Sequence, residues 1–185
     1  MLLEIIEDTT KGMENSMHSL DATFKKIRTG RATASLLDSI RVDYYDKPTP
    51  LSQVASISIE DAKTLAIVPW EKGVSQGIER AILESDLGLN PAVSGDTIRV
   101  ILPDLTEETR RDFIKKAKAE AENAKVSIRN SRRDGNSQLK DFLKEKEISQ
   151  DEQRQGEEEI QKLTDLYVSK VDLLLQGKEK DLLDF

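Results

Sequence analysis

A row of basic side chains is the feature of this sequence that most clearly suggests chemistry. Seven positions between residues 111 and 132, spaced three and four apart, fall on one face of a helix. Six are basic and the other is Glu122; the basic ones are Arg111, Lys115, Lys118, Lys125, Arg129 and Arg132. Aligned like charges repel, and a polyanion would relieve that repulsion. The row, about 32 Å long at about 1.5 Å per residue, predicts contact with a nucleic-acid backbone.

Arginines dominate the C-terminal end of this row. Arg129, Arg132 and the neighbouring Arg133 carry planar guanidinium groups, which can bind a phosphate through two parallel hydrogen bonds. Arg133 lies about 100° from Arg132 on a helical wheel, so its direction differs. Aromatic side chains are scarce nearby, which argues against stacking on single-stranded bases. Contact with the backbone and shape of a folded RNA is the better match.

A second interpretation of the same row involves no nucleic acid. The chain that follows is acidic, and its carboxylates could pair with these cations on a neighbouring helix. The candidates are Glu157, Glu158, Glu159, Asp165 and Asp172. From the residues alone both interpretations stay open.

Composition excludes several other kinds of protein. The 185 residues hold 28 basic and 35 acidic side chains, a net charge of −7, with no cysteine and one histidine, His18. Disulfides, thiolate metal sites and multi-histidine zinc sites are therefore excluded. Net acidity would argue against nucleic acid. However, residues 110–133 hold nine basic and three acidic side chains, net +6, so positive charge is concentrated where the row lies.

No pattern of a catalyst is present. The sequence has no Gly-x-x-x-x-Gly-Lys phosphate loop and no Gly-x-Ser-x-Gly elbow. Acidic pairs such as Glu60-Asp61 are typical of solvated surface. We therefore expect neither an enzyme nor a metal or cofactor. The apolar runs are too short to cross a bilayer, and the acidic N-terminus resembles neither a signal nor a transit peptide, so a mature cytoplasmic protein is expected.

Three aromatic residues are candidates for contact with a partner. They are Tyr44, Tyr45 and Trp70. Packing within strands and loops is the simpler role, and we expect it for at least two of them.

Helical spacing marks both ends of the chain. Residues 2–28 predict one amphipathic helix ended near Gly30, with this face: Leu2, Ile6, Thr9, Met13, Met17, Leu20, Phe24 and Ile27. From residue 105 on there is no proline. A helix is expected from an N-cap at Thr106 to about Lys146, with a row of mostly small residues facing the core: Ile114, Ala117, Ala121, Ala124, Ile128, Ser131 and Gly135. Ser149 and Glu152 predict a capping box that starts a last helix.

The segment between these helices has a different pattern. Residues 31–104 hold all five prolines and predict strands near 40–44, 54–59, 65–68 and 98–102. Residues 75–85 predict a short helix with Ile78, Ile82 and Leu83 on one face, and 48–50 and 93–96 predict turns.

These elements predict an α+β protein. Three helices that cannot bury their apolar stripes alone form a three-helix bundle from residues 1–29 and 105–185. A small mixed α/β, β-rich domain, residues 30–104, is inserted between the first two. Two covalent crossings suit a hinged domain, and we expect hinges at Gly30-Arg31 and Pro103-Asp104.

Several blocks in order resemble the bacterial ribosome recycling factor family across the whole chain. Asp104 stands where a second proline is common, and Thr109 where an arginine is common. The blocks are Lys26-Ile27-Arg28-Thr29-Gly30-Arg31-Ala32, Ser35-Leu36-Leu37-Asp38, Pro48-Thr49-Pro50-Leu51, Ser85-Asp86-Leu87-Gly88-Leu89-Asn90-Pro91, Leu105-Thr106-Glu107-Glu108, Arg129-Asn130-Ser131-Arg132-Arg133-Asp134 and Lys146-Glu147-Ile148-Ser149.

The resemblance implies an L-shaped, two-domain monomer that binds large-subunit ribosomal RNA at the face between the subunits. It implies action after termination with elongation factor G, whose own GTP hydrolysis helps to split the ribosome. It also implies RNA contacts at Arg28, Arg129 and Arg132. The alternative from the residues is a helical scaffold or chaperone-like adaptor that binds proteins through its charged faces.

Overall fold

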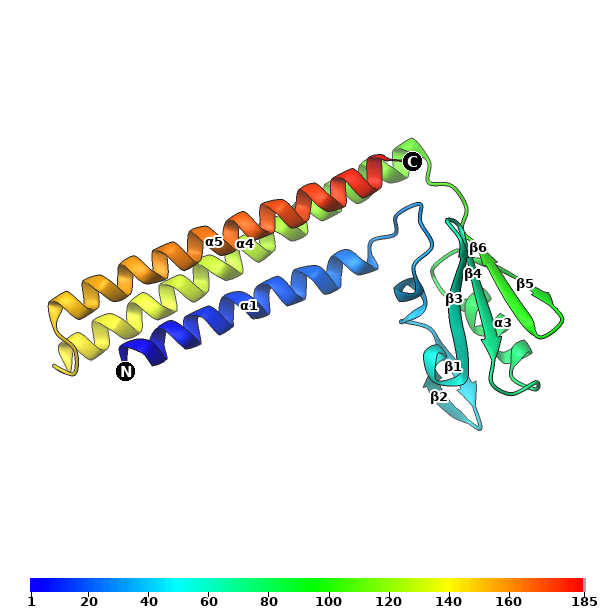
Figure 1. Ribbon diagram of the computed structural model, residues 1–185, viewed down its shortest axis with the longest axis horizontal. Coiled ribbons are helices and arrows are strands. Elements are labelled where there is room, and N and C mark those ends of the chain that lie inside the picture. Colours follow the sequence, from blue (N-terminus) through cyan, green and yellow to red (C-terminus); the bar gives the residue numbers. More distant parts are fainter. Residues whose placement is uncertain (185) are drawn as a thin grey trace. The chain divides into compact units, whose positions relative to one another are not determined.

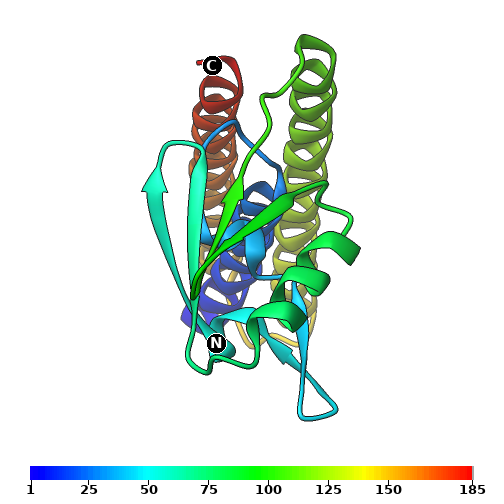
Figure 2. The same cartoon turned by 90° about the vertical axis from the view of Figure 1, so that its right-hand side faces the viewer.

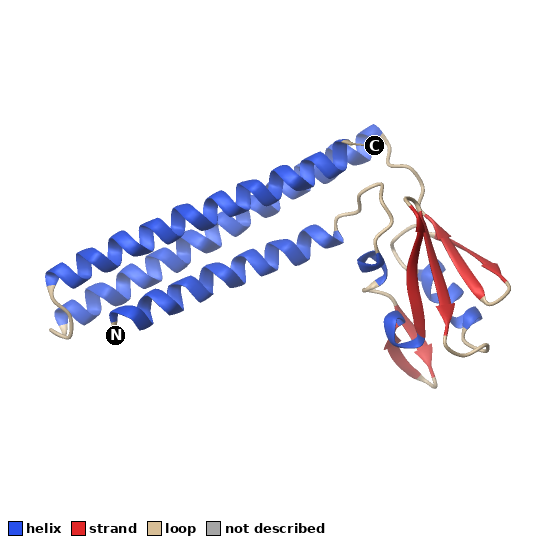
Figure 3. Cartoon of the chain, in the orientation of Figure 1, coloured by secondary structure: helices blue, strands red, loops and turns tan. Residues whose placement is uncertain are grey.

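The computed structural model describes residues 1–184, which form two compact units (Figure 1). The helical unit comprises residues 1–27 and 111–184, and the β-rich unit comprises residues 28–110. All strands lie in the β-rich unit (Figure 3), which confirms the predicted α+β class. None of the described helices is long and apolar enough to cross a membrane. The hinges at residues 30–31 and 103–104 stay a prediction.

Three long helices form the helical unit. They are α1 (Leu2–Lys26), α4 (Glu107–Lys144) and α5 (Gln150–Leu183), and small side chains line much of the buried face of α4. Ile114 and Ser131 of the predicted α4 row are only half-buried, and Leu139 is buried although it was not predicted. The other five residues of the row are buried as predicted: Ala117, Ala121, Ala124, Ile128 and Gly135. A methyl group added at Gly135 would stand 2.4 Å from Oγ1 of Thr9 on α1 and 3.0 Å from Ile160 on α5. Gly135 is therefore where α4 approaches both neighbours.

Helix α1 ends earlier than predicted. Its last helical residue is Lys26, and Ile27 is extended at φ −75° and ψ 115°, so Gly30 is not the stop. Ammonium Nζ of Lys178 donates to the Ile27 carbonyl at 2.9 Å, which satisfies a carbonyl at the helix end. The predicted face was also shifted: Ile6 and Met17 are half-buried, whereas Ile5 and Ser16 are buried.

Both predicted caps are present. The hydroxyl of Thr106 accepts from the Thr109 amide at 3.1 Å before α4. The hydroxyl of Ser149 accepts from the Glu152 amide at 3.2 Å, and the Glu152 carboxylate accepts from the Ser149 amide at 2.7 Å. These bonds fix where the two C-terminal helices begin.

The β-rich unit contains a hairpin and an antiparallel sheet of order β3-β4-β6-β5 (Figure 2). The hairpin pairs β1 (Arg41–Tyr44) with β2 (Lys47–Pro50). The sheet consists of β3 (Ala55–Asp61), β4 (Thr64–Pro69), β5 (Asn90–Ser94) and β6 (Thr97–Ile101). Helix α3 (Ser75–Glu84) packs against β1, β5 and β6, and a 3₁₀ turn η1 (Ala34–Leu37) and a helical turn α2 (Leu51–Val54) complete the unit.

Three predictions for this unit were wrong. Residues 48–50 are not a turn but strand β2, because the chain reverses earlier, at Tyr45-Asp46. Val93 and Ser94 belong to β5, so that turn is only Gly95-Asp96. Leu83 is 57% exposed, because α3 buries only the row through Ile78 and Ile82.

The expected packing of the aromatic residues was wrong as well. Tyr45 is 77% exposed and Trp70 is 68% exposed, and Tyr44 alone is half-buried. At least two of these rings therefore contribute little to the core.

We predict that Gly135→Ala lowers the free energy of unfolding by about 1–3 kcal/mol, because the added methyl overpacks the contact with Thr9. Gly177→Ala in α5 is the matched control, since its new methyl meets nothing within 4 Å. That control should gain about 0.5–1 kcal/mol from helix propensity. Urea denaturation measures both, and equal stabilities for the two variants would contradict the close approach at Gly135.

The capping box predicts a pH dependence. Hydrogen bonds from the Ser149 amide and hydroxyl lower the pKa of Glu152 below its ordinary 4.5. A lowered folded-state pKa gives stability that is present above the unfolded value and lost as pH falls through the folded value. Glu152→Gln should therefore be less stable at pH 7, and the difference should shrink below about pH 4.5. Thermal unfolding from pH 7 to pH 3 checks this, and a constant difference would contradict it.

Candidate nucleic-acid interface

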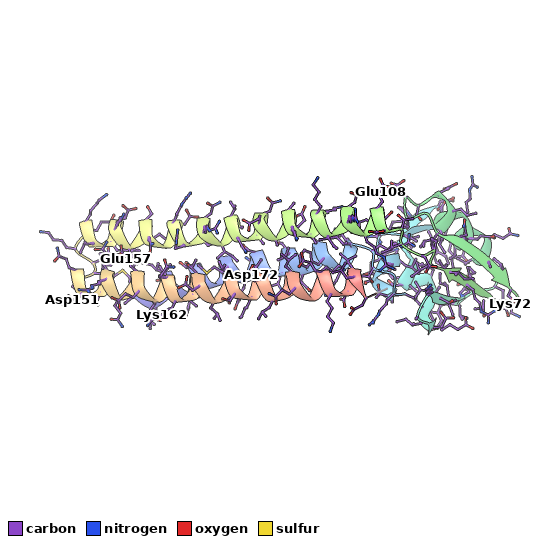
Figure 4. The ribbon with its side chains drawn as sticks, turned by 90° about the horizontal axis from the view of Figure 1, so that it is seen from above. Lys72, Glu108, Asp151, Glu157, Lys162 and Asp172 are labelled. Atoms are coloured by element: carbon purple, nitrogen blue, oxygen red, sulfur yellow. The ribbon has the colours of Figure 1, made fainter. Side chains whose placement is uncertain are left out.

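The predicted basic row lies along the side of α4 that is next to α5. Residues Arg111, Lys115, Lys118 and Arg129 are exposed, whereas Arg132 is half-buried. Figure 4 shows α4 and α5 running alongside each other, with Asp172 on the side of α5 that faces α4 and Lys162 on another side. The row is continuous because α4 is an unbroken helix of 38 residues.

Carboxylates of α5 neutralise part of the row. Ammonium Nζ of Lys125 lies 2.6 Å from Asp172 and 3.4 Å from Glu122, and only 15% of its side chain is exposed. The hydrogen bond to Asp172 raises the pKa of Lys125. Lys118 lies 3.3 Å from Glu179. The second interpretation, pairing with the acidic helix, therefore holds for Lys118 and Lys125.

The arginine end of the row has no such carboxylate partner among the described residues. Arg129 and Arg133 are exposed and make no ion pair or hydrogen bond within residues 1–184. Arg132 donates from Nη1 to the neutral side-chain oxygen of Gln161 at 3.3 Å, and Gln161 donates to Asp165 at 2.9 Å. We call Arg129, Arg132 and Arg133 the arginine cluster. Because no carboxylate of the described chain neutralises these guanidinium groups, they can bind an external anion.

The other carboxylates expected to neutralise the row are held on α5 itself. Glu157 accepts from Gln153 at 3.3 Å. Glu158 lies 3.5 Å from Arg154, and Glu159 lies 3.0 Å from Lys162. The second interpretation therefore fails for these three glutamates, whose recorded partners lie within their own helix.

Lys140 belongs with the arginine cluster but was not predicted. It is exposed, has no recorded partner in the described chain, and lies seven residues after Arg133 on the same α4 face. Steps of three and four taken from Arg133, which lies outside the predicted row, would have found it. The positive surface thus reaches further toward the end of α4 than the predicted row.

Arg28 lies apart from the arginine cluster, in the β-rich unit. Its Nη2 donates to the carbonyl of Pro103, and its Nε is buried without a hydrogen-bond partner. Burial lowers the pKa of the guanidinium. In the described chain, Arg28 therefore connects the two segments that lead to the predicted hinges.

Both of these segments are anchored on the turn between β3 and β4. The Ala32 amide donates to the Ala62 carbonyl, and the Leu102 amide donates to the Lys63 carbonyl, each at 2.8 Å. Lys63 also forms an ion pair with Asp104, whose pKa falls mainly through that hydrogen bond. The predicted hinge residues Gly30, Arg31, Pro103 and Asp104 follow or precede these anchors directly in the chain.

Side chains that could bind a metal ion do not cluster in the described part of the chain. Within residues 1–184, no three His, Cys, Asp or Glu side chains gather as metal ligands. His18 is exposed on α1. The arginine cluster remains the surface with the clearest chemical character, an anion-binding edge.

Comparison with known proteins identifies the family. The family model for the ribosome recycling factor matches residues 20–183. The ribosome-recycling factor of Marinomonas sp. (strain MWYL1) is 53% identical over 184 residues, and that of Legionella pneumophila (strain Paris) is 55% identical over 184, each covering 100% of both chains. The protein of Alcanivorax borkumensis is 56% identical over 183 residues, covering 99% of both chains.

Solved structures agree with the sequence relatives. A solution structure of the ribosome recycling factor matches with a TM-score of 0.79 and 34% identity, covering 100% of this chain and 98% of the other. The T. thermophilus ribosome recycling factor, from models in which it and E. coli elongation factor G are bound to the E. coli post-termination complex, matches at 0.68 with 39% identity, covering 99% of both. The chain belongs to the ribosome recycling factor family.

Proposed function

We propose that this chain binds the post-termination ribosome and, with elongation factor G, promotes separation of the subunits. The observation that carries the proposal is the exposed arginine cluster, which has no carboxylate partner in the described chain. Support comes from a relative whose chain is matched along 99% of its length and which is bound with elongation factor G to a post-termination complex. The site of action is then the cytoplasm.

The arginine cluster would dock on ribosomal RNA of the large subunit at the face between the subunits. Three guanidinium groups and Lys140 line one side of α4, and phosphates arranged along an RNA backbone match such a line. Lys125 and Lys118 contribute less, because Asp172 and Glu179 already neutralise them. Lys115 and Arg111 extend the positive edge toward the start of α4.

The chain would supply binding and leverage rather than bond chemistry. Hydrolysis of GTP would belong to elongation factor G, and this chain would hold no cofactor of its own and act as a monomer. The helical unit would act as a rigid body, because side chains of α1 and α5 pack against Gly135 of α4, and the β-rich unit would move about residues 30–31 and 103–104. Force from elongation factor G would then reach the ribosome through the docked helices.

We predict that reversing the charge of an arginine in the cluster weakens ribosome binding without unfolding the chain. Arg129→Glu, Arg132→Glu and Arg133→Glu should each lower affinity about 10- to 100-fold, the loss typical of a charge-assisted hydrogen bond. Each should also reduce the slope of log affinity against log salt by roughly one. Co-sedimentation with ribosomes at several salt concentrations measures both.

The matched control is Arg154→Glu, an equal charge reversal at an exposed α5 residue that pairs with Glu158. It should change affinity less than about twofold, and Lys125→Gln should fall between the two groups. Wild-type affinity in a folded Arg132→Glu variant would overturn the assignment of the arginine cluster to RNA.

We also predict that stiffening the first junction slows splitting but spares binding. Gly30→Ala narrows the backbone freedom of the junction, and we expect subunit splitting with elongation factor G to slow about two- to fivefold. Light scattering follows splitting, and co-sedimentation follows binding. Gly177→Ala, in open space on α5, should leave both unchanged. Equal splitting rates for the two variants would remove this hinge from the mechanism.

A further inference from the structure

Two adjacent tyrosines form the tip of the β1–β2 hairpin. Tyr44 ends β1, and Tyr45 with Asp46 forms the two-residue turn at φ values of 49° and 60°. Turns with two positive φ values normally use Asn and Gly, because a bulky side chain there is strained. The sequence nevertheless keeps an aromatic ring at this position, and 77% of Tyr45 is exposed.

A carboxylate holds both rings in place. The hydroxyl of Tyr44 donates to Oε1 of Glu71 at 2.6 Å, and the hydroxyl of Tyr45 reaches Oε2 of the same residue at 3.4 Å. The rings meet edge to face, with centroids 4.5 Å apart and planes at 80°. The hydrogen bond to Glu71 raises the pKa of Tyr44 to about 12. The rings are therefore preorganised around an anion.

A cavity of about 270 Å³ opens beside this group. Its walls combine two carboxylates, two aromatic rings and two glycines, and the lining residues are Asp43, Tyr44, Tyr45, Glu71, Gly73, Val74 and Gly77. The glycines leave room, the ring faces attract a cation, and the carboxylates can accept its hydrogen bonds. This combination fits a guanidinium or an ammonium group.

Neighbouring cations of the chain do not occupy the cavity. Arg41 donates to the Asp38 carbonyl at 3.2 Å, and Arg80 pairs with Glu84 at 2.9 Å. Lys47 and Lys72 make no ion pair within residues 1–184. Residues 28–110 hold nine basic and thirteen acidic side chains, so the field around the cavity attracts cations and repels phosphates.

We propose that this cavity receives an arginine or lysine side chain from a basic segment of a partner protein. The ring of Tyr45 covers the cation, and Glu71 and Asp43 pair with it. The inference goes beyond the proposed function, since it assigns a protein-docking site to the acidic β-rich unit. An RNA base stacked on Tyr45 is the rival occupant, and the net acidity of the unit disfavours it.

Nuclear magnetic resonance of the full chain with ¹³C-labelled tyrosine tests the proposal. The probe is N-acetyl-arginine amide, and its neutral isostere N-acetyl-citrulline amide is the ligand control. We expect the arginine probe to shift the Tyr44 and Tyr45 ring signals with a Kd on the order of millimolar. Tyr167 of α5 is the internal control and should not shift, because Lys170 already lies 4.6 Å from its ring centroid.

Variants make the test specific. Tyr45→Ala should weaken binding of the arginine probe about two- to fivefold, and Glu71→Gln about tenfold or more. Tyr45→Phe keeps the ring and should stay within about twofold. Asp96→Asn removes a carboxylate elsewhere in the unit and should change nothing. Equal shifts with the citrulline probe, no shift with the arginine probe, or shifts of Tyr45 only with decauridylate would each overturn the proposal.

Discussion

The contact of side chains from α1 and α5 with the buried face of α4 is the constraint on which the helical unit depends. Three alanines, Gly135, Ile128 and Leu139 form this face, and at Gly135 the side chains of Thr9 and Ile160 reach the α4 backbone. A helix with a narrow buried stripe has most of its circumference left for charge. The basic row uses that circumference about a quarter-turn from the core, close enough to α5 for Lys125 to reach Asp172. Packing and electrostatics are therefore coupled along the whole length of α4.

This coupling divides the row into two functional parts. Where α5 presents Asp172 and Glu179, the lysines of α4 are neutralised and hold the helices together. At Gln161, which is neutral, Arg132 makes a hydrogen bond to α5, and no carboxylate of α5 neutralises its charge. The glutamates nearby pair along α5 instead. The side chains of α5 therefore determine which α4 cations have no carboxylate partner in the described chain, and under the proposed function these cations would let an acidic protein bind a polyanion at one edge.

Local patterns explain how much of this could be predicted from the sequence. Most of the buried face of α4, both caps and the positions of the arginine cluster follow from spacing and from hydrogen bonds within a few residues, whereas the predicted faces of α1 and α3 were partly wrong. The reversal at Tyr45-Asp46 could not be predicted, because it places a bulky residue at positive φ where turn preferences favour Asn and Gly. The pairing of Lys125 with Asp172 and the contact of Arg28 with Pro103 depend on helices and segments far apart in the chain. Lys140 was missed because the predicted row passes through Arg132, whereas Lys140 lies seven residues after Arg133.

Positive charge is concentrated on one edge of α4 although both units are net acidic, and this suggests different kinds of partner for different surfaces. Steering by a protein's field acts through the local surface, so under the proposed function the positive edge of α4 would attract phosphates and the acidic β-rich unit would repel them. A unit repelled by RNA can still be held on a ribonucleoprotein if it contacts a basic protein, and the exposed tyrosines around Glu71 offer such a contact. The anchors on the β3–β4 turn keep the two segments that lead to the helical unit together. A movement imposed on the β-rich unit would therefore act on both crossings at once.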